Sequence, residues 1–305
     1  MWEKLGNIYS RNHSQVPVVE CRGSSWRVFY SDRIDGKSIP KYFDIAKKNF
    51  IILEDSQETI SSLGKRGMFD WAGVMPTYHT KIDENTSYLY YIGWSNRIDV
   101  PYHNNLGLIL TEDGGLSYKK FSRGPIFSTS HKEPGYIGTI SVMQEEELFR
   151  GWYLSCREWI EHEGRVEPTY DIKYAYSKNG IDWIPTNDTC ISLNNDEGGI
   201  SQSAVIKQDD TYHMWFSSRN RTNFREKENS YRIRHAISKD GITWLRSPGT
   251  DFGLEISQDG WDSEMVAYPY VIKEGNDLYM FYNGNGFGKT GIGLARWKKF
   301  NKSKF

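Results

Sequence analysis

Short segments in which almost every residue is apolar recur along the chain at a nearly constant spacing. Their corresponding positions, Trp26, Tyr88, Leu148, Tyr212 and Leu278, are 62, 60, 64 and 66 residues apart. A short run that is apolar at nearly every position is typical of a β-strand covered on both faces. Five such strands are therefore predicted, in residues 24–31, 87–94, 147–155, 211–218 and 277–284.

A second strand-like segment opens each repeat, and a turn signal follows the apolar run in three repeats. The opening segments are residues 15–20, 73–79, 138–144, 201–207 and 267–273. The turn signals are Asp-Gly or Asn-Gly pairs that end at Gly114, Gly180 and Gly241. Both residues of such a pair tolerate a positive φ, which suits tight hairpins. We interpret these pairs as purely structural.

Each repeat thus contains an inner strand, a second strand, a third strand, a turn and an outer strand, which is the composition of a propeller blade. We predict an all-β, five-bladed β-propeller with four-stranded antiparallel blades, built as a single domain from residues 1–305. The fifth repeat lacks its outer strand. Residues 2–9 are expected to supply it by pairing with residues 291–297, because this closes the ring and removes a sheet edge.

The composition agrees with a folded protein that handles neither nucleic acid nor a membrane. Aromatic residues make up 15% of the chain, whereas disordered chains are poor in them. The formal charge is −1, so no basic stripe for nucleic acid is expected. No apolar run approaches the roughly 20 residues of a membrane span, and the N-terminus lacks a signal-peptide core. The three cysteines are too few for a disulfide framework, which favours buried thiols in a cytoplasmic protein.

The loops that lead into the inner strands, here called lead-in loops, are expected on one mouth of the central channel, and they are unusually polar. Carboxylates that converge in one concavity repel each other, which separates their pKa values and their acid and base roles. The alternative is that each acid is merely solvated or caps a turn. The polar lead-in residues are His13, Gln15, Asp70, Glu133, Asp196, Glu197, Asp262 and Glu264.

The loops between second and third strands add cations and aromatic rings on the same mouth. Arginine presents a planar fork that suits carboxylate or phosphate, and an aromatic face suits the apolar face of a sugar ring. The alternative is that these arginines only neutralise the lead-in acids. The candidates are Arg33, Asn96, His103, Arg157, Trp159, Arg219, Arg221, Asn283, Asn285 and Lys289, with Arg234 on a nearby strand. Residues 283–291, NGNGFGKTG, lack the spacing of a P-loop.

Eight segments, spread over nearly the whole chain, share their pattern with a known group of proteins. They are HSQVP (13–17), FDWAGVMP (69–76), YLYYIGW (88–94), GPIFSTSHKEPGYIGT (124–139), DIKYAYSKNGIDW (171–183), DEGGIS (196–201), GWDSEMVAYPY (260–270) and YMFYNGNGFGKTGIGLA (279–295). Through them the chain resembles the five-bladed propeller glycosidase superfamily, which includes glycoside hydrolase families 43, 32, 68 and 130. It looks most like the glycosidase-related proteins of bacterial surface-polysaccharide clusters.

The resemblance implies catalytic roles for lead-in carboxylates. Those families use an acid at the start of blade one, an Asp on blade two and an acidic Glu near blade three, which implies Asp70 and Glu133 for the last two. Blade one departs from this pattern, because its lead-in loop holds His13 and Gln15 but no carboxylate. Inverting hydrolysis needs two carboxyl groups about 6.5–9.5 Å apart, so Glu264 would have to supply the base.

Three functions therefore stay open at this point. We favour an enzyme that acts on a glycosyl donor, a phosphorylase or a transferase, in bacterial polysaccharide metabolism. The others are a hydrolase with a relocated base and a non-catalytic sugar-binding or assembly protein. The expected ligand is a sugar, a sugar phosphate or a nucleotide sugar, with no metal and no other cofactor.

We further expect the ligand to be anionic, because the pocket lacks the blade-one carboxylate. Its anionic group would be held by some of Arg157, Arg219, Arg234 and Lys289, and a protonated His13 could add positive charge. The other substrate-binding candidates are Gln15, Trp159, Glu197, Asp262, Asn283 and Asn285.

Overall fold

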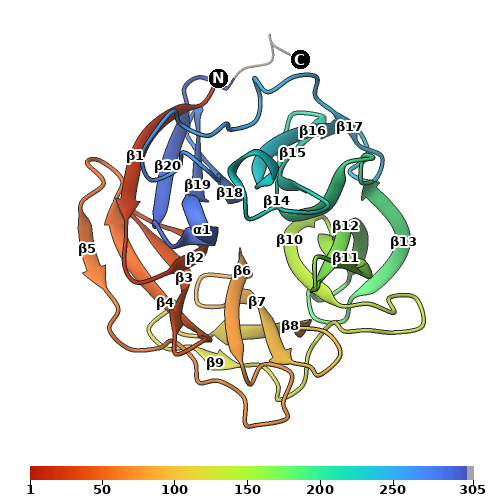
Figure 1. Cartoon of the computed structure of the whole chain (residues 1–305). Helices are drawn as coiled ribbons and strands as arrows, with labels where there is room; N and C mark the ends of the chain where they lie inside the picture. The colour runs from red at the N-terminus through yellow and green to blue at the C-terminus, as the bar shows by residue number, and fades with distance from the viewer. Residues whose placement is uncertain (301–305) are drawn as a thin grey trace.

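The computed structural model describes residues 1–300, and strand pairing there divides the chain into five antiparallel groups of four strands. We number these groups as blades one to five. Figure 1 shows them arranged around a common centre, with β2, β6, β10, β14 and β18 innermost. Single parallel bridges join blade one to two and blade three to four, at Ser38–Gly73 and Tyr170–Gly199. The predicted all-β propeller architecture is confirmed.

The strand bounds match the two predicted sets of segments. Blade one contains β2 (Ser14–Arg22), β3 (Ser25–Ile34), β4 (Lys37–Ala46) and β5 (Ile52–Asp55). Blade two contains β6 (Gly73–Lys81), β7 (Ser87–Asn96), β8 (Tyr102–Thr111) and β9 (Lys119–Lys120). Blade three contains β10 (Ile137–Glu145), β11 (Leu148–His162), β12 (Arg165–Ser177) and β13 (Ile184–Ile191).

The last two blades follow the same plan. Blade four contains β14 (Glu197–Gln208), β15 (Thr211–Asn220), β16 (Arg232–Ser238) and β17 (Leu245–Arg246). Blade five contains β18 (Ala267–Glu274), β19 (Asp277–Asn283), β20 (Ile292–Trp297) and, as its outer strand, β1 (Glu3–Tyr9). The helical elements among residues 1–300 are η1 (Lys227–Asn229) and the single turn α1 (Asn285–Gly288). Neither has the length or the apolar character to cross a membrane.

The N-terminal strand closes the ring as predicted. β1 pairs antiparallel with β20, from Glu3 opposite Arg296 to Tyr9 opposite Ile292. The indole of Trp2 also donates a hydrogen bond to the carbonyl of Phe252, at 3.1 Å. The two ends of the described chain are therefore joined in one blade, which leaves no unpaired edge on β20.

The hydrophobic core lies between neighbouring blades. Trp26, Trp152 and Trp215, on the second strands of blades one, three and four, are almost fully buried. The ring of Trp26 meets that of Phe281 from blade five, with centroids 5.3 Å apart. Burial on both faces explains why the second strands are apolar at nearly every position. Each such aromatic side chain contributes about 1.5–3 kcal/mol of hydrophobic free energy.

The recurring turn signals are indeed turn chemistry. The side-chain oxygens of Asp113, Asn179 and Asp240 accept hydrogen bonds from backbone N–H groups two to four residues ahead, at 2.8–3.0 Å. Gly180 and Gly241 in the same turns have φ values of 73° and 75°, which a glycine adopts without strain. These turns connect third strands to outer strands, so they shape the outer part of each blade.

Candidate functional site

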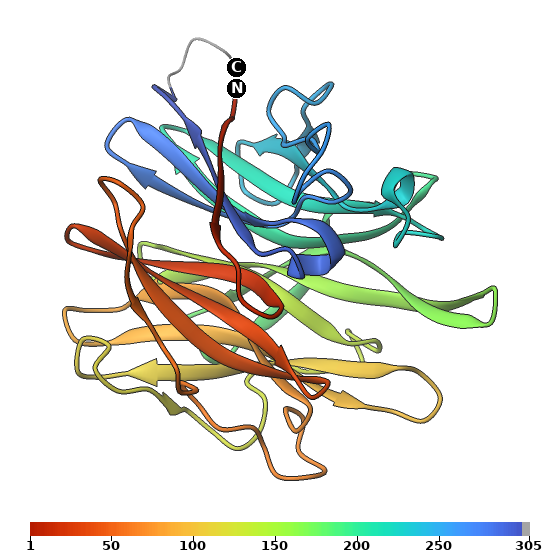
Figure 2. The same cartoon turned by 60° about the vertical axis from the view of Figure 1, so that its left-hand side comes forward.

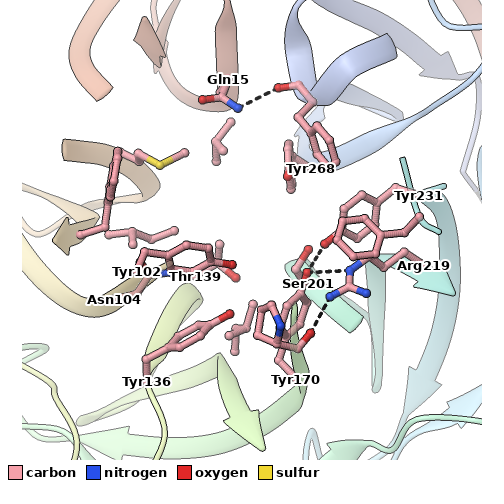
Figure 3. A pocket seen from close by; sticks show the side chains of 18 of the residues that line it. Gln15, Tyr102, Asn104, Tyr136, Thr139, Tyr170, Ser201, Arg219, Tyr231 and Tyr268 are labelled. Atoms are coloured by element: carbon pink, nitrogen blue, oxygen red, sulfur yellow. Dashed lines mark hydrogen bonds between the residues drawn. The ribbon is translucent and has the colours of Figure 1, made fainter. Parts of the chain in front are cut away.

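The mouth formed by the lead-in loops and the loops between second and third strands contains a pocket of about 410 Å³. Every blade contributes to its wall, and Figure 3 shows the labelled side chains surrounding an open space. Its lining residues are His13, Gln15, Val16, Arg33, Met75, Ile92, Trp94, Tyr102, Asn104, Tyr136, Thr139, Leu154, Glu167, Pro168, Tyr170, Ser201, Arg219, Phe224, Arg225, Tyr231, Tyr268 and Phe287. We call this the central pocket.

Irregular backbone at the start of the inner strands shapes this pocket. Each inner strand has a register shift near its first residues, as between Gln15 and Val18 in β2. Val16, Gln202 and Tyr268 take positive φ values of 54°, 46° and 56° within these shifts. A bulge re-aims side chains, and a left-handed β-branched residue such as Val16 is strained unless its surroundings hold it.

Asn283 provides that support for Val16. Its amide oxygen accepts a hydrogen bond from Val16 N at 2.7 Å, and its amide nitrogen donates to the carbonyl of Ser14 at 2.7 Å. Asn283 is fully buried and does not line the pocket. Predicted as a substrate-binding residue, it instead positions the backbone of the pocket wall.

Polar side chains connect opposite blades at the inner strands. The Gln202 amide of blade four donates to the carbonyl of Thr77 in blade two, at 3.1 Å, and accepts from the Thr77 hydroxyl, at 3.2 Å. Thr139 of blade three accepts from Gln202 N at 3.0 Å. Since Gln202 is fully buried, these bonds fix the relative positions of three blades next to the pocket.

Aromatic rings make up much of the pocket wall. Tyr102 and Tyr136 lie with centroids 5.7 Å apart, and Trp159 packs against them at 5.4 and 5.8 Å. Trp159, a predicted ligand contact, thus supports two lining tyrosines from behind. The lining aromatics were not predicted from the sequence: Tyr136 ends the lead-in loop of β10, and Tyr268 is the second residue of β18. The lining rings are Trp94, Tyr102, Tyr136, Tyr170, Phe224, Tyr231, Tyr268 and Phe287.

Two buried polar atoms of the lining have no hydrogen-bond partner within the described residues. They are the side-chain oxygen Oε1 of Gln15 and the hydroxyl Oγ of Ser201. Their residues are only 7% and 3% exposed. The other end of Gln15 is fixed, because its amide nitrogen donates to the carbonyl of Phe287 at 3.0 Å. A buried polar atom without a hydrogen bond lowers the stability of the fold, so both atoms favour a ligand that can form a hydrogen bond with them.

The charged lining residues are mostly cations. Glu167 is the single carboxylate lining the pocket in residues 1–300, and its Oε1 is 2.5 Å from Nη1 of Arg225. Arg33 lies over the ring of Trp94, at 5.2 Å, and forms no ion pair with a carboxylate in the described part of the chain. Burial lowers the pKa of the Arg33 guanidinium.

Arg219 is the most constrained cation of the wall. It is 2% exposed and donates to the hydroxyl of Tyr170 at 3.0 Å, the carbonyl of Pro168 at 2.6 Å and that of Asn220 at 2.9 Å. Its guanidinium stacks on the ring of Phe224 at 3.8 Å. All of these partners are neutral, and no described carboxylate forms an ion pair with it. The pocket wall therefore contains a buried charge without a counter-ion.

His13 differs from the sequence expectation in its charge. Its Nε2 lies 3.1 Å from the carbonyl of Phe287, which is an acceptor only, so this nitrogen carries a proton. Burial lowers the pKa of His13, and the nearby charges of Arg33 and Lys289 lower it further, against bonds to backbone carbonyls that raise it. The net shift is downward, so His13 is mainly neutral at pH 7 and adds little positive charge.

The lead-in carboxylates do not line the central pocket, contrary to the predicted convergence. Asp70 accepts from Tyr91 at 3.0 Å and pairs with Lys120 on the outer strand at 2.5 Å. Asp262 accepts from Tyr282 at 3.0 Å and pairs with Lys4 on its outer strand at 2.7 Å. Both carboxylates are nearly fully buried by these partners. They are placed as internal ion pairs of blades two and five.

Blades three and four contain variants of the same arrangement. Glu133 accepts from Tyr153 at 2.8 Å and pairs with Lys173 at 2.9 Å. Glu197 accepts from both terminal nitrogens of Arg246, at 2.7 and 2.8 Å. Burial acts to raise the pKa of Glu197, but its bonds outweigh this and the pKa is lowered. The predicted catalytic and binding roles of these acids therefore gain no support from their positions.

Three other residues predicted to bind the substrate also lie outside the lining of the central pocket. Arg157 pairs with Asp171 at 3.1 Å, and Arg234 pairs with Glu255, so both of these arginines are already neutralised outside the pocket. Asn285 accepts from the backbone nitrogens of Glu264 and Met265, at 2.8 and 3.0 Å, and so anchors that lead-in loop. Arg157 and Arg234 are therefore poorly placed to bind an anionic ligand, because each would first have to break its ion pair with a carboxylate.

Glu264 and Lys289 are exposed and lie outside the lining of the central pocket. Of the candidate residues named from the sequence, the structure brings His13, Gln15, Arg33 and Arg219 together around one pocket. In residues 1–300 no three His, Cys, Asp or Glu side chains gather in a group that could hold a metal ion.

Two known proteins are similar to this chain in sequence. No family model matches the chain. Two Mycobacterium tuberculosis proteins, named as uncharacterized proteins MT1551 and Rv1502, are each 33% identical over 307 residues. The match covers 96% of this chain and 98% of each relative.

Solved structures with the same fold are carbohydrate-related. A structure named simply as a glycoside hydrolase has a TM-score of 0.71 at 17% identity, over 99% of this chain and 92% of that one. A thermostable family-43 glycoside hydrolase has a TM-score of 0.71 at 13% identity, over 96% and 91%. A structure from the GH130 family of mannoside phosphorylases has 0.70 at 11% identity, over 97% and 87%. At these identities the likeness shows the shared fold.

Proposed function

The chain belongs to the same family as the mycobacterial proteins MT1551 and Rv1502, and we propose that it is a carbohydrate-active protein whose central pocket holds an anionic sugar, such as a sugar phosphate or a nucleotide sugar. The observation that carries the proposal is Arg219, a buried guanidinium with neutral partners alone. A buried charge without a counter-ion costs several kcal/mol, on the order of 3–5 kcal/mol where a pair is broken. An anionic ligand removes that cost.

The geometry of Arg219 leaves donors for such a ligand. A guanidinium has five N–H groups, and three of them serve Tyr170, Pro168 and Asn220. The remaining two sit on the terminal nitrogens, close to the hydroxyl of Tyr231, and a phosphate or carboxylate oxygen can accept from them. Arg33, without an ion-pair partner among residues 1–300, offers a second cation on the opposite blade.

The rest of the lining supports a sugar as the body of the ligand. Six lining tyrosine and tryptophan rings offer apolar faces with polar edges. The free oxygens of Gln15 and Ser201 can bond to ligand hydroxyls. Pockets that combine aromatic walls with a few placed polar groups are typical small-molecule sites.

The proposed reaction is glycosyl transfer from a donor whose leaving group is the phosphate. The bond between the anomeric carbon and the phosphate oxygen breaks, and its electron pair leaves with the phosphate near Arg219. An acceptor hydroxyl forms the new bond to the same carbon and gives its proton to the carboxylate of Glu167. A transfer of this kind needs one carboxylate, whereas hydrolysis by the two-carboxyl mechanism needs two. The lining supports the first arrangement.

The second candidate is a non-catalytic sugar-binding protein. It is favoured by the ion pair between Glu167 and Arg225 at 2.5 Å, which occupies the one lining carboxylate found in the described chain. A hydrolase with Glu264 as relocated base has less support, because Glu264 is exposed and lies outside the pocket lining. The setting we propose remains bacterial polysaccharide metabolism.

The test is calorimetric titration of the wild type and of Arg219 variants with a panel of sugar phosphates and nucleotide sugars. Arg219→Met should weaken binding by about tenfold or more, because a charge-assisted hydrogen bond contributes about 1.5–3 kcal/mol. Arg219→Lys keeps the charge and should recover part of the affinity. The matched control is Arg234→Met, which removes an arginine outside the pocket. Unchanged affinity in Arg219→Met would refute the proposal.

A further inference from the structure

A second cavity of about 280 Å³ adjoins the central pocket. One wall is the tip of the long β11–β12 hairpin, and the other is the loop between β15 and η1. Figure 2 shows the hairpin, in green, and this loop, in teal, projecting on the same side of the ring. We call this the outer chamber. Its lining residues are His162, Glu163, Arg165, Glu167, Arg221, Thr222, Asn223, Phe224, Arg225 and Glu226.

The two cavities share a wall. Glu167, Phe224 and Arg225 line both of them. The carboxylate of Glu167 therefore stands between the central pocket and the outer chamber, held there by Arg225 at 2.5 Å. A group bound in either cavity can approach the same carboxylate.

The outer chamber differs from the central pocket in its charge. Its three arginines are matched by three glutamates, so it has no excess of positive charge. Arg225 already pairs with Glu167, and Arg221 pairs with Glu158 at 2.9 Å. Arg165 forms no ion pair with a described carboxylate, but it is exposed, so its charge is screened by solvent. The chamber suits a neutral ligand.

Its polar groups suit a ligand with many hydroxyls. Thr222 and Asn223 contribute hydroxyl and amide groups from the loop. Nε2 of His162 is shielded from water and has no hydrogen-bond partner among residues 1–300, since Glu163 is 3.8 Å away. A ligand hydroxyl can supply the hydrogen bond that this buried nitrogen lacks.

A nucleoside fits the outer chamber less well. A base would need an open aromatic face, and the phenyl ring of the chamber, that of Phe224, is covered by the guanidinium groups of Arg219 at 3.8 Å and Arg225 at 4.5 Å. A diphosphate would need several clustered cations, whereas two of the three arginines are already paired with glutamates and the third, Arg165, is exposed. The balanced charges and the hydroxyl and amide groups favour a saccharide instead.

We infer that the outer chamber binds the acceptor of the transfer, the end of a neutral oligosaccharide, with its attacking hydroxyl directed to Glu167. This inference rests on the proposed function, since it takes the central pocket to hold the anionic donor. The balance of the step is unchanged: the acceptor hydroxyl loses its proton to Glu167 as it bonds to the anomeric carbon, and the phosphate leaves.

The experiment uses Thr222→Trp, which places a bulky ring in the outer chamber from a partly exposed loop. The matched control is Lys227→Trp, which adds the same ring to the exposed η1 helix outside the chamber. Wild type, both Trp variants and Arg219→Met are measured on an array of neutral mono- to tetrasaccharides, with the sugar-phosphate panel present and absent. Sugar-phosphate and nucleotide-sugar binding is titrated separately.

We expect Thr222→Trp to weaken oligosaccharide binding by about tenfold or more and to leave sugar-phosphate binding within about twofold. Arg219→Met should weaken sugar-phosphate binding and leave oligosaccharide binding within about twofold. Lys227→Trp should bind both kinds of ligand as the wild type does. Unaffected oligosaccharide binding in Thr222→Trp, or no oligosaccharide binding by the wild type, overturns the inference but not the proposed function. Loss of nucleotide-sugar binding in Thr222→Trp would assign the chamber to a nucleoside and also overturn the inference. If sugar phosphates and nucleotide sugars fail to bind the wild type, the proposed function itself fails.

Discussion

Arg11 and Asp55 form an ion pair, Nη1 to Oδ2 at 3.1 Å, in which the charges are reversed relative to the other blades. In blades two, four and five, the lead-in loop supplies the carboxylate and the outer strand supplies the cation, as with Asp70 and Lys120. In blade one the lead-in loop supplies the arginine, and the outer strand β5 supplies the carboxylate. The missing carboxylate of blade one is thus a charge reversal within a repeated structural pair.

Hydrogen bonds from tyrosines reinforce this interpretation. Burial, followed by the neighbouring carboxylate, raises the pKa of Tyr91, Tyr153 and Tyr282, so all three stay protonated and donate to Asp70, Glu133 and Asp262. In blade one, Tyr9 donates to Asp55 at 2.9 Å and shares a hydrogen bond with Tyr30. The lead-in loops of blades two, three and five are therefore tied to their blades by buried polar clusters.

The first prediction is that Asp70→Asn lowers stability and leaves ligand binding unchanged. Removing one charge of a buried pair strands the other, so the free energy of unfolding should fall by about 3 kcal/mol. Sugar-phosphate affinity should stay within about twofold, because Asp70 does not line the pocket. Urea unfolding and calorimetry measure the two quantities.

The control for this variant is Glu112→Gln, which breaks the exposed pair between Glu112 and Lys119. Exposed pairs contribute about 0–1 kcal/mol, so its stability should hardly change. A stable Asp70→Asn variant that no longer binds or turns over sugar would show that Asp70 belongs to the functional site.

The second prediction concerns closure of the ring. A variant without residues 2–9 should fail to fold cooperatively, because the edge of β20 becomes exposed and Asp262 loses Lys4. Lys4→Met alone should cost about 3 kcal/mol, since it strands a buried carboxylate. Thermal melts followed by circular dichroism test both. A truncated protein that melts at the wild-type temperature would contradict this account of the fold.

The third prediction is a loss of stability below pH 6.5 caused by the buried pair His213 and His235, whose ring nitrogens are 3.2 Å apart. Burial lowers the pKa of His213 to about 4 and that of His235 to about 3, with Lys239 and His213 as the respective second causes. Both values lie below the 6.5 of the unfolded chain, so unfolding takes up protons as the pH falls.

The contribution of the pair is therefore complete above pH 6.5 and is lost as the pH falls toward the folded-state values. Between pH 6.5 and 5.5 the pair should lose about 1–2 kcal/mol. Urea unfolding at several pH values measures this, and His235→Gln should flatten the slope. Equal slopes in the variant and the wild type would assign the effect to other groups.

The fold was largely predictable from the sequence because the repeats are visible in the regular spacing of their apolar segments. Trp26 and its counterparts mark the second strands, and the Asp-Gly turns mark the hairpins beyond the third strands. The N-terminal strand was predictable because the fifth repeat has no outer strand of its own, so residues from the other end of the chain must supply it. The domain boundaries 1–305 stay a prediction.

The site was predictable only as a region. Repeat positions placed the polar loops on one mouth, and His13, Gln15, Arg33 and Arg219 do line the pocket there. The sequence could not say which charges neutralise each other, because that depends on pairs such as Lys4 and Asp262, which are 258 residues apart. The lining tyrosines were not predictable in this way, because Tyr102, Tyr170 and Tyr268 lie within strands, where the sequence does not show which side chains face the pocket.

The most direct test of the central claim is calorimetric titration of the wild-type protein with sugar phosphates and with their neutral parent sugars, at low and high salt. The account predicts that the anionic sugars bind at least about tenfold more tightly than their parents, because Arg219 gains a charged partner. It also predicts that this advantage shrinks as salt rises from about 0.05 to 0.5 M, because charges near the mouth are screened. Equal binding of both sets at both salt concentrations, with no affinity for the anionic group, would contradict it.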